Sequence, residues 1–374
     1  MPVQRIGASR LALRQIEHQW GLASIADLYV SRLKLMIAPL AKLIDWSVLR
    51  ICFAMVPQSV WREAANGRGL KMEQAVQFLN GPDFIPAGSQ PAQLDFGPDA
   101  PGGRFRFPTP RPCEFAENNV VHGRLYRCAD AWQERPVIVW LHGGSDFPGN
   151  QFVFHWFARR SQRAGFNAAT LESPYHFQRR PRQYGPVDLL RQYIPLISRD
   201  YLQMAKTWAQ AVAEIRSLSG WLLAEGCPAV ALVGASLGAY LAGLTACRDA
   251  RLASIVVAMP AARMGLLPKS YQDVVGGRRV RELTHRRGAA CEELDGTPLN
   301  LTTARPAISK ENVLLIEGIH EGSPHALELW QSWGQPEIWR LPHGHISTVL
   351  MPGLSGRILR WLTLRLDSPT IQQH

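Results

Sequence analysis

The chain has 374 residues, of which 46% are apolar and 19% are charged. This composition excludes a disordered protein, and 12 Trp and 13 Phe supply material for a sizeable core. The net charge is +11, but the basic residues are spread along the chain without a run of five or a nucleic-acid-binding signature. We therefore expect a basic surface and no nucleic-acid site.

The six cysteines form no Cys-x-x-Cys pair and have no metal-ligand spacing with histidine. No apolar run follows the basic residues at the start, as a secretory signal would require. We therefore expect a cytoplasmic protein without a metal or cofactor.

The first hundred residues differ from the rest. Residues 11–20 and 25–56 are rich in apolar residues at helical spacing, and Pro39 should kink or divide the second segment. Lys42, Asp45 and Arg50 would be costly inside a bilayer, which argues against a membrane span. We favour a helical N-terminal extension packed on the rest of the chain. Peripheral membrane contact through residues 28–56 is the second interpretation.

Glycine and proline gather between residues 80 and 112, which marks turns or a linker. We expect a helical extension over residues 1–100 and one catalytic domain over residues 101–374. Strands and helices alternate in the second part, which predicts an α/β fold with a doubly wound, mostly parallel sheet. The expected strands are 105–107, 119–127, 136–141, 166–171, 229–233, 252–258, 313–316 and 337–341, and the expected helices are 152–164, 200–224, 237–247 and 355–364.

Ser236 is the candidate nucleophile. It lies in Gly-Ala-Ser-Leu-Gly at 234–238, directly after an apolar strand and before an Ala/Leu-rich helix. The residues two before and two after the serine must be small, because such a sharp turn brings them together. The turn also sets Ser236 at a helix N-terminus, where N–H groups favour a developing oxyanion.

The loop after the strand at 136–141 reads His-Gly-Gly-Ser at 142–145. Two backbone N–H donors should form an oxyanion hole, one from Leu237 and one from Gly144, with Ser145 as the alternate. A structural role for His142 is the other interpretation of this loop.

The acid and the base should follow the serine in that order along the chain. Glu321, three residues after Gly318, fits the acid, and Glu317 is the second choice because it is still close to the strand. His345 follows the last strand and leads into a helix, so it fits the general base, with His343 as the fallback.

These motifs, with Glu-Gly-Ile-His-Glu-Gly at 317–322 and Pro-His-Gly-His at 342–345, resemble the α/β-hydrolase superfamily over roughly residues 103–366. Residues 119–126 and 172–180 are similar to the dienelactone hydrolase and acetyl-esterase-like branch. The resemblance implies metal-independent hydrolysis of an ester, thioester or amide through an acyl-enzyme. Dienelactone hydrolases proper use a Cys nucleophile and an Asp, whereas this chain has Ser236 and Glu321, so their substrate does not carry over.

Cap insertions are expected near residues 174–198 and 261–310, where the alternation is interrupted. With His142 and Ser145, Tyr175 and His176 are candidates for substrate binding. Arg179 and Arg180 could receive an acidic group of the substrate, although solvated surface arginines are the favoured interpretation.

The leading hypothesis is a serine hydrolase of small-molecule carboxylic esters or thioesters. The alternatives are an acyltransferase with the same triad, a membrane-associated lipase and a non-catalytic binding protein of this fold.

Overall fold

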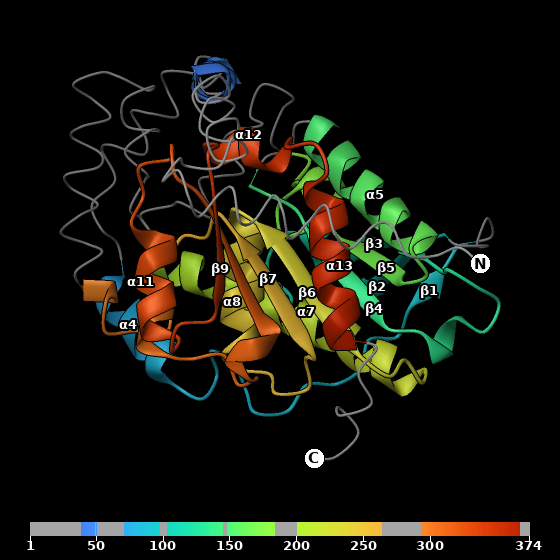
Figure 1. The fold of residues 1–374 in the computed structure, drawn as a ribbon. Helices are drawn as coiled ribbons and strands as arrows, with labels where there is room; N and C mark the ends of the chain where they lie inside the picture. The colour runs from blue at the N-terminus through green and yellow to red at the C-terminus, as the bar shows by residue number, and fades with distance from the viewer. Residues whose placement is uncertain are drawn as a thin grey trace, which may run out of the picture.

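The computed structural model describes residues 39–48, 50, 71–97, 103–144, 148–183, 200–263 and 293–366. These residues form a nine-stranded sheet with the order β1-β2-β3-β5-β4-β6-β7-β8-β9, covered by helices on both faces (Figure 1). The first three strands are antiparallel to their neighbours, and β5, β4 and β6–β9 run parallel to one another. The expected doubly wound, mostly parallel sheet is confirmed.

The strand bounds lie close to the expected ones. The strands are β1 Asp95–Phe96, β2 Arg104–Pro108, β3 Val120–Tyr126, β4 Val137–Leu141, β5 Asn167–Leu171, β6 Val230–Ala235, β7 Ser254–Ala258, β8 Val313–Gly318 and β9 Glu337–Leu341. The central strands β4 to β8 are buried throughout, as is typical of parallel strands covered on both faces.

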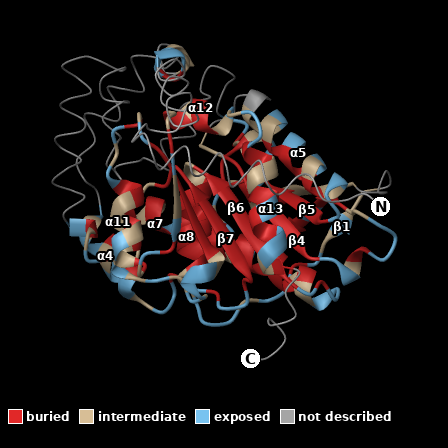
Figure 2. Cartoon of the chain, in the orientation of Figure 1, coloured by how far each residue is buried: buried red, intermediate tan, exposed pale blue. Residues whose placement is uncertain are grey.

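Alternate side chains of each strand enter two separate cores. In β6, Val230 and Leu232 join one core, while Ala231 and Val233 join the other. The first core lies under α4 Met72–Asn80, α7 Tyr201–Ala224, α8 Leu237–Ala246 and α11 His325–Ser332, and the second under α5 Pro148–Arg163 and α13 Leu354–Leu366. Figure 2 shows the buried sheet between partly exposed helices.

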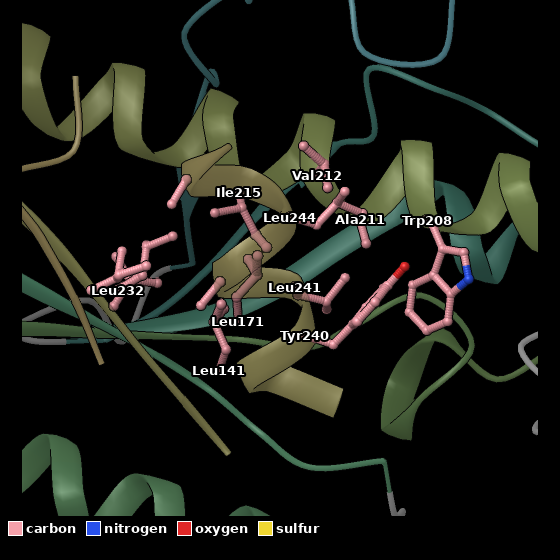
Figure 3. Close-up of a cluster of buried hydrophobic side chains, with 14 of the residues drawn as sticks. Leu141, Leu171, Trp208, Ala211, Val212, Ile215, Leu232, Tyr240, Leu241 and Leu244 are labelled. Carbon is pink, nitrogen blue, oxygen red and sulfur yellow. The ribbon is translucent and has the colours of Figure 1, made fainter. Parts of the chain in front are cut away.

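The first core contains the largest buried side chains. Trp208 of α7 meets Tyr240 of α8 edge to face, with ring centroids 5.1 Å apart, beside Leu141 and Leu171 of the sheet (Figure 3). The Tyr240 hydroxyl donates to the Leu299 carbonyl at 2.7 Å, so the buried polar group has a partner. This packing fixes α8, and with it the turn that carries Ser236.

The Gly- and Pro-rich segment contains more structure than the sequence predicts. Strand β1 lies within it, and α4 precedes it. Leu79, Phe84 and Ala92 are buried in the same core as α7 and α8. The part of residues 71–97 expected to be an extension is therefore built into the core of the sheet.

Candidate active site

Ser236 lies in a strained turn between β6 and α8. Its φ is 55° and its ψ is −115°, a conformation that is uncommon for a residue with a side chain and persists where the surroundings impose it. A Cβ on Gly234 would lie 2.1 Å from the Gly238 carbonyl oxygen, and one on Gly238 would lie 2.0 Å from the Leu141 carbonyl oxygen. Both positions therefore require glycine, for the steric reason that the sequence motif suggests.

The carboxyl ends of β6, β7, β8 and β9 meet at one edge of the sheet. The Ser236 N–H donates to the Ala258 carbonyl at 2.9 Å, and the Met259 N–H donates to the Ile316 carbonyl at 2.8 Å. The Ile319 N–H donates in turn to the Leu341 carbonyl at 2.9 Å. Ser236, Glu321 and His345 follow the ends of β6, β8 and β9, so all three belong to this edge.

His345 and Glu321 form a buried pair. The Nδ1 of His345 lies 2.7 Å from Oε1 of Glu321, and the two residues are only 7% and 5% exposed. A carboxylate at this distance accepts from Nδ1–H, which makes Nε2 the acceptor nitrogen of the neutral ring. Burial lowers the pKa of His345, but the charge and hydrogen bond of Glu321 and the charge of Asp45 outweigh it, so the pKa is raised.

The fallback residues have other partners. Glu317 lies opposite Arg340 on β9, whose Nε donates to its carboxylate at 2.5 Å. His343 has a pKa lowered mainly by burial, and its carbonyl accepts from the His320 N–H at 2.9 Å. Among the described residues, Glu321 is the carboxylate that contacts His345.

The loop after β4 lies against the Ser236 turn. A Cβ on Gly143 would lie 3.7 Å from Cβ of Ser236. The Gly143 carbonyl is 2.7 Å from Nδ1 of His142 and accepts from Nδ2 of Asn150 at 2.8 Å. In a trans peptide, N–H and C=O point in opposite directions, so holding this carbonyl also fixes the direction of the Gly144 N–H.

His142 is held from both ring nitrogens. Its Nε2 accepts from the Ser173 N–H at 2.9 Å, which leaves Nδ1–H to donate to the Gly143 carbonyl. Burial, with the nearby His176 charge as a second cause, lowers the pKa of His142 to about 3, so the ring stays neutral. This is the structural role that the sequence offers as the other interpretation, although the ring also borders a cavity.

Tyr175 and His176 are fully buried, which does not favour the expected contact with substrate. The Tyr175 hydroxyl accepts from Nε2 of Gln203 at 2.9 Å, and Nδ1 of His176 lies 2.8 Å from the Pro174 carbonyl. Burial lowers the pKa of His176 to about 4. Ser145 lies outside the described residues, as do residues 184–199 and 264–292, which hold most of the two expected cap insertions.

Arg179 has neither of the roles that the sequence suggests, since it is not a solvated surface arginine and does not receive a substrate anion. Its side chain is fully buried and makes a two-pronged ion pair with Glu214 of α7, with N–O distances of 2.6 and 2.7 Å. The guanidinium also donates to the Asn118 and Glu172 carbonyls at 2.6 and 2.9 Å. A buried arginine paired in this way is a structural tie between the loop after β5 and α7.

Sequence reasoning missed two residues beside this site. Asn150 lies in the first turn of α5 and carries no motif of its own. In the sequence, Asp45 is only a charge that argues against a membrane span. In the structure it is buried against the helix that begins at His345. No sequence signal connects positions so far apart in the chain.

Within the described ranges, no group of three or more His, Cys, Asp or Glu side chains is placed to hold a metal ion. In the same part of the chain, no helix combines the length and apolar character needed to cross a membrane.

A family model described as "Alpha/beta hydrolase domain containing 18" matches residues 115–264. An uncharacterized protein of Mycobacterium tuberculosis is 31% identical over 255 residues, which cover 63% of this chain and 57% of the relative. The match thus spans little more than half the length of that curated protein.

Two solved structures with similar folds are an esterase from Pyrobaculum calidifontis and acetyl xylan esterase 1 from a Thermoanaerobacterium species. The first has a TM-score of 0.47 at 14% identity and covers 88% of this chain and 98% of its own. The second has a TM-score of 0.48 at 12% identity and covers 83% of this chain and 98% of its own.

The family model covers β3 to β7, including the strand, sharp turn and helix around Ser236. The strand order and the parallel connections agree with the fold that the model describes. The chain has the α/β-hydrolase fold, and its residues 115–264 match an α/β-hydrolase family model.

Proposed function

We propose that the protein hydrolyses a small-molecule carboxylic ester or thioester through an acyl-enzyme, with Ser236 as nucleophile, His345 as general base and Glu321 as the acid. The observation that carries the proposal is the buried 2.7 Å contact between His345 and Glu321, at the sheet edge to which the strained Ser236 turn belongs. A strained nucleophile turn followed in the chain by an acid and a histidine is the arrangement used for acyl transfer.

The reaction follows from these roles. Oγ of Ser236 attacks the ester carbonyl while Nε2 of His345 takes the hydroxyl proton. Glu321 keeps the ring in the tautomer that can accept this proton and stabilises the imidazolium that forms. The imidazolium then protonates the leaving alcohol or thiol, which leaves an acyl group on Ser236. Water then attacks the acyl carbon while Nε2 of His345 takes a proton from it. The bond between the acyl carbon and Oγ breaks, the imidazolium returns the proton to Oγ, and the carboxylic acid departs.

The negative oxygen of each tetrahedral intermediate needs preorganised donors. Leu237 is the first residue of α8, so its N–H has no partner within the helix. Gly144 supplies the second N–H, from the peptide whose carbonyl His142 and Asn150 hold. These contacts support the assignment of Leu237 and Gly144 to the oxyanion hole.

A fluorophosphonate probe, followed by a panel of p-nitrophenyl esters of increasing chain length, tests the proposal. Wild-type protein should be labelled and should hydrolyse at least one ester, and Ser236→Ala should do neither. Ser309→Ala is the matched control, because Ser309 is exposed and lies before β8. Absence of labelling in the wild type, or labelling that survives Ser236→Ala, would exclude the proposed reaction.

One observation favours the membrane-associated alternative for the same activity. Leu40, Leu43 and Trp46 follow one another at helical spacing in residues 39–48 and are 58%, 57% and 45% exposed. Such a stripe beside Lys42 suits the surface of an anionic bilayer.

Flotation with anionic vesicles tests this alternative. The wild type should float with the vesicles, and the Leu40→Ser/Leu43→Ser variant should stay in the dense fractions. Phe152→Ser, at another exposed apolar side chain, should float like the wild type.

A further inference from the structure

Asp45 is a buried carboxylate at the start of the helix that carries His345. It lies in the helical residues 39–48 and is 7% exposed. Its Oδ1 accepts from the Ile346 N–H and, at 3.4 Å, from the Ser347 N–H. Its Oδ2 accepts from the Ser347 hydroxyl at 2.6 Å. These partners are the second and third residues of α12 His345–Val349.

The first N–H groups of any helix have no partner within the helix, so a side chain usually caps them. In α12 the residue before the helix is Gly344, which has no side chain to do so. A Cβ on Gly344 would lie 2.5 Å from Oδ2 of Asp45. The carboxylate of Asp45 thus occupies the place of a local cap, although it comes from a segment some 300 residues earlier in the chain.

The hydrogen bonds to Asp45 fix the backbone next to His345, and Glu321 holds the imidazole ring of His345. The Gly344 N–H donates to the Ser347 hydroxyl at 2.9 Å, and that hydroxyl donates onward to Asp45. The backbone N–H groups just before and just after His345 therefore lead to one carboxylate. Rigid support of this kind is what a general base needs to stay within reach of its nucleophile.

We propose that Asp45 is a positioning residue for His345, and that the N-terminal segment completes the active site by capping the catalytic helix. The inference rests on the proposed function, because it assigns His345 the role of general base. It gives a role to part of the N-terminal segment, which lies outside residues 115–264, the range that the family model matches.

Asp45 also places a negative charge near the imidazole, and this charge raises the pKa of His345, although burial and Glu321 have larger effects. The other titratable groups around the turn are His320, His343 and Lys42, which interact with one another or with Asp45 through their charges. Removing the charge of Asp45 should therefore favour the neutral imidazole and lower the pKa of His345.

The test compares Asp45→Asn and Asp45→Ala in the full chain. Asp45→Ala removes the cap and should lower kcat about 10- to 100-fold with KM changed less than about threefold, because an ill-placed base slows the proton transfer. Asp45→Asn keeps an oxygen acceptor and should recover most of kcat, while the acidic limb of the kcat/KM profile moves to lower pH.

Asp200→Ala is the matched control, since Asp200 caps α7 by accepting from the Gln203 N–H at 3.0 Å. It should lower the melting temperature and leave the pH profile in place. Wild-type kinetics in both Asp45 variants would overturn the inference, as would equal kcat losses in Asp45→Ala and Asp200→Ala. If wild-type protein is not labelled by fluorophosphonate, the proposed function fails first, so the two failures are distinguishable.

A separate observation concerns a cavity of about 520 Å³ between the outer strands and α5. The register aligns Arg104, Arg124, Thr170 and Trp140 across β2, β3, β5 and β4, and all four line the cavity. They belong to the sheet face that α5 covers, where Trp140 joins the second core. Along this row the side chains change from apolar at Trp140, in the core under α5, to cationic at Arg124 and Arg104 on the outer strands.

The charges of this cavity are mostly positive. Among the described residues, neither Arg104 nor Arg124 forms an ion pair with a carboxylate. Among the lining residues that the structure describes, Glu172 is the one acidic side chain, and it accepts from Gln151 and Gln178. Positive charges gathered in a concave site favour an anion.

His155 of α5 brings a neutral donor to the same cavity. Burial, helped by the charges of Arg124, Arg159 and Arg104, lowers the pKa of His155 to about 4. Its Nδ1 lies 2.8 Å from the Tyr126 hydroxyl, and the charges of Arg124 and Arg159 act on that hydroxyl. When the hydroxyl donates its proton to Nδ1, Nε2 carries the ring hydrogen and can donate it.

We infer that this cavity binds a small oxyanion, a carboxylate or a phosphate, between Arg104, Arg124 and Nε2–H of His155. Two guanidinium groups suit such an anion because they donate paired, charge-assisted hydrogen bonds. The inference does not depend on Ser236, and Ser236→Ala protein can be used to measure it.

Calorimetric titration with inorganic phosphate and, separately, with acetate tests the site. At least one anion should bind saturably with a Kd of about 1–10 mM, and Arg104→Gln or Arg124→Gln should weaken it at least about fivefold. Arg106→Gln is the matched control, since Arg106 lies on the same strand but pairs with Asp95 at 2.7 Å. Absence of saturable binding of either anion would overturn the inference. Equal weakening by Arg106→Gln would also overturn it, because the binding would then reflect the general basic surface.

Discussion

At the scale of single residues, the contact between Glu321 and His345 makes a prediction about pH. Glu321→Gln removes the two effects that chiefly raise the pKa of His345 while burial remains, so this pKa should fall. The acidic limb of kcat/KM should move to lower pH, and kcat should drop by about 10²- to 10⁴-fold because the tautomer is no longer fixed. The pH–rate profile and single-turnover kinetics measure both effects.

Glu317→Gln is the control for that experiment. Glu317 carries the same charge only four residues earlier but pairs with Arg340, so its loss should leave the pH profile unchanged. A profile altered by Glu317→Gln and not by Glu321→Gln would reverse the assignment of the acid.

Asn150 makes a second prediction at this scale. Asn150→Ala removes one of two groups that hold the Gly143 carbonyl, so the Gly144 N–H should lose part of its fixed direction. A lost oxyanion donor costs about 10²- to 10³-fold in kcat, and an indirect loosening should cost about 10-fold with little change in KM. Steady-state kinetics measure both constants. A higher KM with unchanged kcat would instead indicate that Asn150 binds the substrate.

The residues of the candidate site differ in how well the sequence could predict them. Ser236, Glu321 and His345 each follow a strand in a fixed chain order, so local pattern and topology are sufficient to propose them. His142 and Tyr175 lie in the right loops, but sequence cannot tell that their side chains turn inward. Asp45 is beyond sequence reasoning, because its role depends on a tertiary contact across the whole chain.

At the scale of elements, the buried pair of Arg179 and Glu214 joins the loop after β5 to α7. Glu214→Leu would leave a fully buried guanidinium without its counter-ion and should lower the free energy of unfolding by about 3–5 kcal/mol. The double variant Arg179→Met/Glu214→Leu should recover most of this loss, because it removes both charges together. Urea denaturation measures the three proteins.

An exposed pair provides the contrast. Asp95 and Arg106 are joined at 2.7 Å with side chains 55% and 63% exposed, so Asp95→Ala should cost less than about 1 kcal/mol. A Glu214→Leu variant as stable as Asp95→Ala would show that the buried tie contributes little to the attachment of α7.

At the scale of the whole molecule, the sequence predicts the central sheet better than its edge. Strands β4 to β8 are mostly apolar because both faces are buried, and their expected bounds agree with the structure to within a few residues. Strand β1 has only two residues and lies among glycines and prolines, so its pairing with β2 is set by tertiary contact. The turn residues around it therefore indicate a linker when read alone.

The same contacts predict the result of a truncation. A chain that starts at Cys113 would lack α4, β1 and β2, and with them the buried Leu79, Phe84, Phe105 and Phe107 of the first core. Exposing the facing side chains of that core should abolish cooperative unfolding, which a thermal melt followed by near-ultraviolet circular dichroism would show.

Point variants make the comparison quantitative. Phe84→Ala in the full chain should cost about 3–5 kcal/mol, because the ring is 2% exposed, whereas Phe152→Ala, at a ring that is 67% exposed, should stay within about 0.5 kcal/mol. A cooperative melt of the truncated chain near the full-length midpoint would instead place the boundary of an independently folding domain after β2. Because the truncation is expected to unfold, membrane binding of the N-terminal segment has to be measured with the full chain and the Leu40→Ser/Leu43→Ser substitutions.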